Sequence, residues 1–149
     1  MNQMEAREVK ETVEHHGEKI ELSIPNKAEF VSVVRLTLVA IANRVGFNIE
    51  EIEDMKVAIA EACTNAITHG NNTPAESINI HFTLMEKGLE IEVKDKGVGC
   101  DVEKIEDPKI EELNENGLGI FIIRSLMDDV KIHSEPDQGM TIIMTKMIG

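Results

Sequence analysis

One stretch of alternating residues, "SINIHFTLMEKGLEIEVKD" from Ser77 to Asp95, constrains the fold of this chain more than any other feature. It contains two runs with a period of two, joined by the short segment "EKG". The residues that share the apolar face are Ile78, Ile80, Phe82, Leu84, Leu89, Ile91 and Val93. A period of two is typical of strands with one buried face, so the stretch predicts an antiparallel β-hairpin that a second layer must cover.

The first helix that can supply this layer is predicted from about Lys27 to Arg44. It follows the strand "IELSIP", which ends at Pro25, and Asn26 is placed to cap it. Gly46 is expected to end it. The residues expected in its apolar stripe are Phe30, Val33, Val34, Leu38 and Ile41.

A second helix is predicted from Ile49 to about His69, with Gly70 as its stop. Asn48 and Glu51, three residues apart, resemble a capping box at its start. The residues expected to face the core are Ile52, Met55, Ile59, Cys63, Ala66 and Ile67.

The C-terminal half begins with a loop of roughly 20 residues from Gly97 to Gly117, a length that favours a functional lid. A short helix, "LGIFIIRSLMDD", follows it, and then the strands "VKIHS" and "MTIIMTKM" joined by the turn "EPDQG". The order of elements predicts an α+β two-layer sandwich over residues 20–149, with a mixed, mainly antiparallel sheet and helices on one face. Residues 1–19 are polar and are expected to form an extension.

The charge of the chain disfavours several classes of function. The 149 residues carry a formal net charge of −13, which argues against binding to nucleic acid or to an anionic membrane surface. No segment is long and apolar enough for a membrane span, and no signal peptide is recognisable. Cys63 and Cys100 form neither a metal pattern nor a disulfide framework, so we expect a soluble cytoplasmic protein.

Four polar residues gather on one side of the second predicted helix. Glu61, Asn65, Thr68 and His69 fall within roughly a 100° arc, beside the apolar face. Such an arc is either a solvated face or a site. For a site the chemistry is suitable, because an Asn amide oxygen is a ligand for Mg²⁺ and a Glu one turn away can act as a general base.

Three glycine-containing segments complete the set of candidate motifs. "DKGVG", from Asp95 to Gly99, leaves a strand, and its glycines permit either a simple turn or a close approach of backbone to ligand. "NGLGI", from Asn116 to Ile120, opens a helix, where free N–H groups favour anions such as phosphate. "GMT", ending at Thr141, opens the last strand and carries no meaning alone.

Taken together, the order and spacing of these motifs resemble the ATP-binding fold shared by gyrase, Hsp90, histidine kinases and MutL. Two longer stretches, "VRLTLVAIANRVGFNIEEIEDMKVAIAEACTNAITHG" and "GLGIFIIRSLMDDV", are similar to the anti-sigma-factor serine kinases of bacteria. This closer resemblance extends over about residues 20–147 and implies a sandwich of the histidine-kinase-like (Bergerat) type.

The resemblance also implies roles for single residues. Asn65 would coordinate the Mg²⁺ that bridges the phosphates of ATP, and Glu61 would be the general base. Asp95 would accept a hydrogen bond from the adenine amino group. The further residues that would contact the nucleotide are Gly97, Gly99, Gly117, Leu118, Gly119 and Thr141.

Members of this family phosphorylate a Ser of an anti-anti-sigma protein, sequester a sigma factor and form homodimers; Arg35 matches the Arg that contacts the sigma factor. One departure is the lid segment "PKIEELNENGLG", where Glu115 stands nearest the place at which some members have an Arg. Two alternatives remain open. One is an anti-sigma module that binds nucleotide with negligible kinase activity. The other is the catalytic domain of a histidine kinase, which is disfavoured because no preceding dimerisation domain with a phosphoacceptor His is found.

Overall fold

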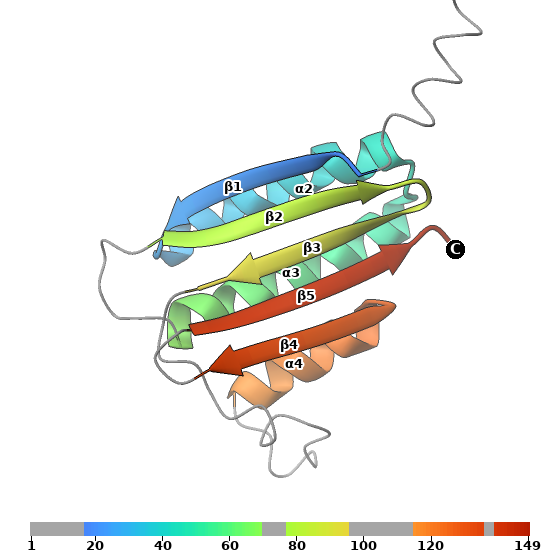
Figure 1. The fold of residues 1–149 in the computed structure, drawn as a ribbon. Helices are drawn as coiled ribbons and strands as arrows, with labels where there is room; N and C mark the ends of the chain where they lie inside the picture. Colours follow the sequence, from blue (N-terminus) through green and yellow to red (C-terminus); the bar gives the residue numbers. More distant parts are fainter. Residues whose placement is uncertain (1–16, 70–76, 96–114, 136–138) are drawn as a thin grey trace, which may run out of the picture.

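The computed structural model describes residues 17–69, 77–95, 115–135 and 139–149, and in these residues a single sheet lies against a layer of helices (Figure 1). The sheet has the strand order β1-β2-β3-β5-β4, and every neighbouring pair is antiparallel. Its strands are β1 (Lys19–Pro25), β2 (Ser77–Met85), β3 (Gly88–Lys94), β4 (Asp129–Glu135) and β5 (Gly139–Met147). The predicted hairpin is the β2–β3 pair, closed where Met85 pairs with Gly88.

All the helices cover one face of this sheet, as predicted (Figure 1). They are a 3₁₀ turn η1 (Ala28–Phe30) and the helices α2 (Val31–Val45), α3 (Ile49–His69) and α4 (Glu115–Leu126). The long helix α3 lies between α2 and α4 in Figure 1. Its position therefore lets it contact both neighbouring helices as well as the sheet.

The core lies between the two layers. The largest fully buried side chains include Phe82, Leu84, Leu89 and Ile91 from the hairpin, and Leu38, Met55 and Ile59 from the helices. Alternation along β2 and β3 buries every second residue, which is the pattern that the sequence predicts. None of the helices in the described ranges has the length and apolarity needed to cross a membrane.

The start of α2 differs from the prediction in two respects. The chain enters the helix through η1, whose N-cap residue is Lys27 with no side-chain capping bond, so Asn26 does not have the capping position assigned to it. Val33 is 41% exposed, because a step of about 100° from the buried Val34 turns it away from the sheet. The helix end is confirmed: Gly46 has φ of 108°.

The predicted capping box at the start of α3 is confirmed. Asn48 Oδ1 accepts a hydrogen bond of 2.8 Å from Glu51 N, and Glu51 Oε1 accepts one of 2.9 Å from Asn48 N. Glu51 Oε2 also accepts a bond of 2.9 Å from Gly149 N. The backbone N–H of Asn48, and next that of Gly149, hold the pKa of Glu51 below its ordinary value of 4.5.

Replacing Glu51 by Ala is expected to lower the Tm at neutral pH by about 3 °C, because the carboxylate no longer accepts hydrogen bonds from Asn48 N and Gly149 N. Since the folded-state pKa of Glu51 is depressed, its contribution is present above pH 4.5 and is lost as the pH falls through the folded value. Thermal melts between pH 7 and pH 3 should show the two Tm curves converging in acid. Glu50→Ala, in the same helical turn, is the control; an equal effect of both changes would contradict the capping assignment.

Helix α4 begins earlier and ends earlier than predicted. It spans Glu115–Leu126, so it includes Gly117, and the two Asp residues that follow belong to the connection and to β4. Asp128 N donates a hydrogen bond of 2.9 Å to Thr145 O, which draws the chain into the sheet after the helix. The remainder of the predicted lid, residues 97–114, lies outside the described residues, as do Lys96 and residues 1–16.

Candidate functional site

The polar face of α3 carries the centre of the candidate site. Asn65 is buried, with 5% of its surface exposed, and its Nδ2 has no hydrogen-bond partner among the residues that the structure describes. A buried amide without a protein partner is costly, so the position is suited to a group that comes from outside the chain. Rotation of the amide by 180° exchanges nitrogen and oxygen, and the same position can therefore present an oxygen ligand.

The first turns of α4 lie directly against this face. A Cβ atom placed on Gly119 would stand 3.1 Å from Glu61 Oε2 and 3.4 Å from both Asn65 Oδ1 and Nδ2. Residues that the sequence places far apart are thus brought together, and a larger residue at position 119 would press on both polar groups. Gly117 is also buried, whereas the Leu118 side chain is 45% exposed.

The second polar group buried in the described residues is Asp95, at the end of β3, with 4% of its surface exposed. Its N donates a hydrogen bond of 3.1 Å to Met140 O, and its Oδ1 accepts one of 3.3 Å from Met140 N. These bonds fix the carboxylate at the end of the β3–β5 pair. The sequence gives no signal for Met140, because it acts through its backbone.

Some predicted site residues lie elsewhere or outside the described part of the chain. Thr141 pairs with Lys94, and alternation along β5 puts it on the face opposite to the buried Met140, so its side chain is not on the same side of the sheet as Asp95. Thr68 is exposed. Gly97 and Gly99 lie outside the described residues, and so does the side chain of His69.

The groups present fit Mg²⁺ with a nucleotide. Asn65 offers one amide oxygen from α3, and Mg²⁺ is usually held by few protein oxygens while phosphates and waters complete its shell; Glu61 lies one turn away, placed to act as a base. Gly119, the fifth residue of α4, lies against them, so the positive end of the helix dipole lies within about one turn of these groups. The site is therefore suited to a bound phosphate chain.

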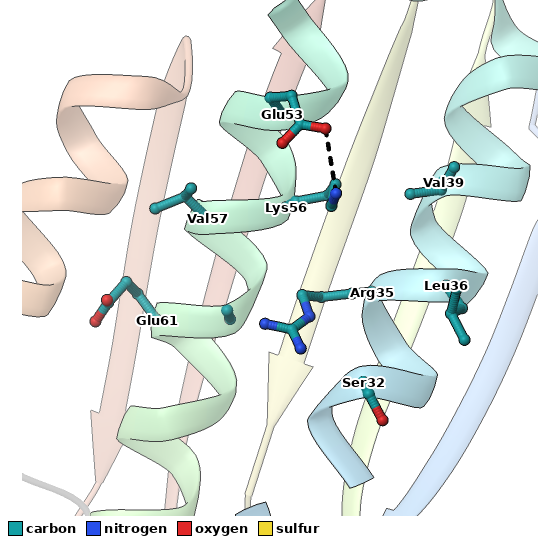
Figure 2. Close-up of a pocket in the computed structure, with 9 residues that line it drawn as sticks. Ser32, Arg35, Leu36, Val39, Glu53, Lys56, Val57 and Glu61 are labelled. Carbon is teal, nitrogen blue, oxygen red and sulfur yellow. Dashed lines mark hydrogen bonds and ion pairs between the residues drawn. The ribbon is translucent and has the colours of Figure 1, made fainter. Parts of the chain in front are cut away.

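A groove of about 580 Å³ runs between α2 and α3, and Glu61 is one of the residues that line it, although its carboxylate points away from Arg35 in Figure 2. In Figure 2, Arg35 extends from α2 toward α3, and Lys56 pairs with Glu53 at 3.1 Å. The residues that line the groove are Ser32, Arg35, Leu36, Val39, Glu53, Lys56, Val57, Ala60 and Glu61. Glu61 thus contributes to the lining of the groove, while its Oε2 lies against Gly119 of α4.

Sequence reasoning did not identify the apolar part of this groove. Leu36 is 71% exposed and Val57 is 46% exposed, although both are large apolar residues on helices with well-formed core stripes. The sequence does carry a signal for it, since neither residue falls in the periodic stripe of buried apolar residues on its helix. Exposed apolar residues beside charged ones are typical of surfaces that contact other proteins.

Cys63 has no chemical role in this site. Burial against the sheet raises the pKa of its thiol to about 12, so it stays protonated at physiological pH and contributes packing. Cys100 lies outside the described residues.

The chain matches the model of the histidine kinase-like ATPase domain family over residues 24–146. It is 47% identical to the serine-protein kinase RsbW of Bacillus cereus (strain ATCC 10987 / NRS 248) over 139 residues, which cover 88% of this chain and 86% of the relative. The RsbW of Bacillus thuringiensis (strain Al Hakam) has the same identity and coverage.

Two solved structures share the fold at low sequence identity. One contains the RsbU and RsbW domains of a Mycobacterium tuberculosis protein, with a TM-score of 0.65 and 18% identity, covering 88% of this chain and 32% of that one. The other, the SiaB–SiaC complex of Pseudomonas aeruginosa, has a TM-score of 0.60 and 12% identity, and 99% of both chains is covered.

Proposed function

The chain belongs to the RsbW serine-protein kinases of the histidine kinase-like ATPase family, and from this membership we propose that it binds Mg²⁺–ATP, phosphorylates a Ser of an anti-anti-sigma protein and sequesters a sigma factor. The observation that carries the proposal is the meeting of Glu61 and Asn65 with the start of α4. Glu61 there is also one of the residues that line the α2–α3 groove.

In this proposal the nucleotide lies along the edge of α3, between Asp95 and the start of α4. Asp95 recognises adenine through a carboxylate that Met140 holds in place. Asn65 is the protein ligand of Mg²⁺, and the backbone at Gly117, Leu118 and Gly119 contacts the phosphates. Gly97 and Gly99 are proposed to approach the nucleotide, whereas we assign Thr141 no contact with adenine because of its face.

The chemistry proposed for Glu61 is that of a general base. Its carboxylate accepts the proton of the acceptor Ser hydroxyl as the oxygen of that Ser bonds to the γ-phosphorus of ATP. The bond between the γ-phosphorus and the oxygen that bridges it to the β-phosphate breaks, and ADP leaves. Mg²⁺ offsets the negative charge of the phosphates when it is bound.

The α2–α3 groove supports a place for the protein partners. It offers apolar side chains beside Arg35, while Lys56 is paired with Glu53, so it suits an apolar segment with an acidic group placed to face Arg35. Since Glu61 is one of the residues that line the groove, we propose that the acceptor Ser approaches the base from this side of α3. We further propose that the active form is a cytoplasmic homodimer in which Arg35 contacts the sigma factor.

The test of the function is transfer of label. The purified protein with Mg²⁺ and γ-labelled ATP is expected to label its anti-anti-sigma partner on Ser, and a pull-down with ATP and with ADP should retain the sigma factor in a nucleotide-dependent way. If nucleotide binds but no label is transferred, the chain is a nucleotide-binding anti-sigma module instead of a kinase.

Replacing Arg35 by Ala is expected to weaken sigma-factor binding about tenfold, since a cation at the centre of a charged interface is typically worth more than 1 kcal/mol. Surface plasmon resonance at two salt concentrations measures the change, and the salt dependence should fall with the affinity. Arg44→Ala, on the last turn of the same helix, is the control. Equal sigma-factor affinity in the Arg35 variant and the parent would remove Arg35 from the interface.

A further inference from the structure

One lysine occupies a position where the strand pattern calls for an apolar residue. On β5, every second residue faces the helices, and Met140, Ile142 and Met144 are buried there. Lys146 is the next residue on that face, and only 14% of its side chain is exposed. A cation beneath a helical layer is costly to desolvate, so an apolar residue would serve stability at least as well. The position therefore calls for another explanation.

The contacts of Lys146 join three elements. Its Nζ donates a hydrogen bond of 2.7 Å to Leu126 O, the carbonyl of the last residue of α4, and lies 3.9 Å from Asp54 Oδ2 on α3. The carbonyls at a helix C-terminus lack partners within the helix and carry partial negative charge. The ammonium group thus binds the end of α4 directly to β5 and, more weakly, to α3.

The opposite end of α4 is the end that forms the site. Leu126 lies near the level of Asp54, whereas Gly119 lies against Glu61 and Asn65, so α4 runs antiparallel to α3. A helix of 12 residues is about 18 Å long and behaves as a rigid rod over that length. A shift of its C-terminal end along its axis therefore moves Gly119 by the same amount relative to Glu61.

The chain after α4 is tied to the same part of β5. Asp128 N donates to Thr145 O at 2.9 Å, and Met147 N donates to Asp128 Oδ2 at 2.6 Å. Those bonds hold the connection to β4, while Lys146 is bonded to the helix itself. The bond from Lys146 to the end of α4 is thus distinct from the bonds that attach the connection between α4 and β4.

We propose that Lys146 is a positioning residue for phosphate binding: it holds α4 at the axial position at which the backbone around Gly119 and the Glu61–Asn65 pair form one site. The inference rests on the proposed function, because it concerns the same phosphate site. It predicts that a change of Lys146 affects binding of the phosphates but not binding of the adenine. Asp95 is held by β5 at Met140, so adenine recognition does not depend on α4, whereas the phosphate contacts do.

The experiment compares Lys146→Met, Lys146→Gln and Lys146→Arg in the full chain, with Lys131→Met on the exposed side of β4 as the control. Affinities for Mg²⁺–ATP by calorimetry and for adenosine by ligand-observed NMR are measured well below the Tm of each variant. We expect the Met and Gln variants to lose about tenfold in Mg²⁺–ATP affinity and to keep the adenosine affinity of the parent, since small displacements of a positioned group have large effects. The Arg variant should restore ATP binding, because it keeps the cation and the donor.

Several outcomes would overturn the inference. ATP affinity like that of the parent in the Met variant, even with a lower Tm, would show that Lys146 is only structural. Equal losses for ATP and adenosine would show general loosening of the fold. If the Met variant does not fold, the Gln variant decides by the same two affinities. If the parent protein binds no Mg²⁺–ATP, the proposed function is refuted. If the parent and the Met variant bind Mg²⁺–ATP equally well, only the role of Lys146 is refuted.

Discussion

Replacing Glu61 by Ala is expected to reduce Ser phosphorylation by about 10²- to 10⁴-fold while the affinity for Mg²⁺–ATP stays close to that of the parent. The reason is the position of the carboxylate. It lies against Gly119 of α4 beside Asn65, and Glu61 is also one of the residues that line the groove proposed for the acceptor. Removal of the base leaves Asn65, Asp95 and the start of α4 in place, so the nucleotide keeps its contacts. Single-turnover transfer of labelled phosphate and calorimetric ATP binding measure the two quantities separately.

The same helix provides the matched control. Glu53 lines the same groove two turns before Glu61, and it pairs with Lys56 on the surface. Glu53→Ala should leave the rate of phosphate transfer within about twofold of the parent, because Glu53 does not lie beneath α4. Full transfer by the Glu61 variant would remove the base assignment, and parallel loss of ATP binding would make Glu61 a binding residue instead.

The sequence predicted the layers of this fold well because the period of burial is local information. The hairpin and α3 appear with the expected bounds, since alternation in Ser77–Met85 and a capping box at Asn48 are visible in short windows. The error at Val33 has the opposite origin. Its side chain lies on a flank of α2 next to the buried stripe, and the sequence period alone does not show where that stripe ends.

The site was predicted less completely for the same physical reason. Glu61 and Asn65 were recognisable as polar residues next to an apolar face, but their closeness to Gly119 depends on where α4 lies across the sheet. The role of Met140 depends on a backbone pair, and that of Lys146 on a helix end that is distant in sequence. Periodicity does place Lys146 on the inner face of β5, so the unusual position was detectable even though its partner was not.

Replacing Asp95 by Asn is expected to weaken ATP binding by roughly 10- to 100-fold with little change in Tm. Asn keeps an Oδ1 that can accept the hydrogen bond of 3.3 Å from Met140 N, so the β3–β5 connection persists. The other half of the amide is a donor. If the carboxylate accepts a hydrogen bond from the adenine amino group, the substitution brings the amide N–H and the adenine N–H face to face. Only 4% of residue 95 is exposed, so water cannot bond to these two donors. Calorimetric titration with Mg²⁺–ATP and thermal melts measure both effects.

A comparison of bases makes this prediction specific to adenine. Guanine carries an acceptor oxygen where adenine carries its amino group, so an amide donor at position 95 suits guanine better than a carboxylate does. The Asn variant should therefore lose ATP affinity while its GTP affinity holds or rises, and the preference for ATP should shrink. Glu92→Gln, on the outward face of the same strand, should change neither affinity. Equal ATP affinity in the Asp95 variant and the parent would show that Asp95 does not contact the adenine amino group. The base would then have to bind elsewhere.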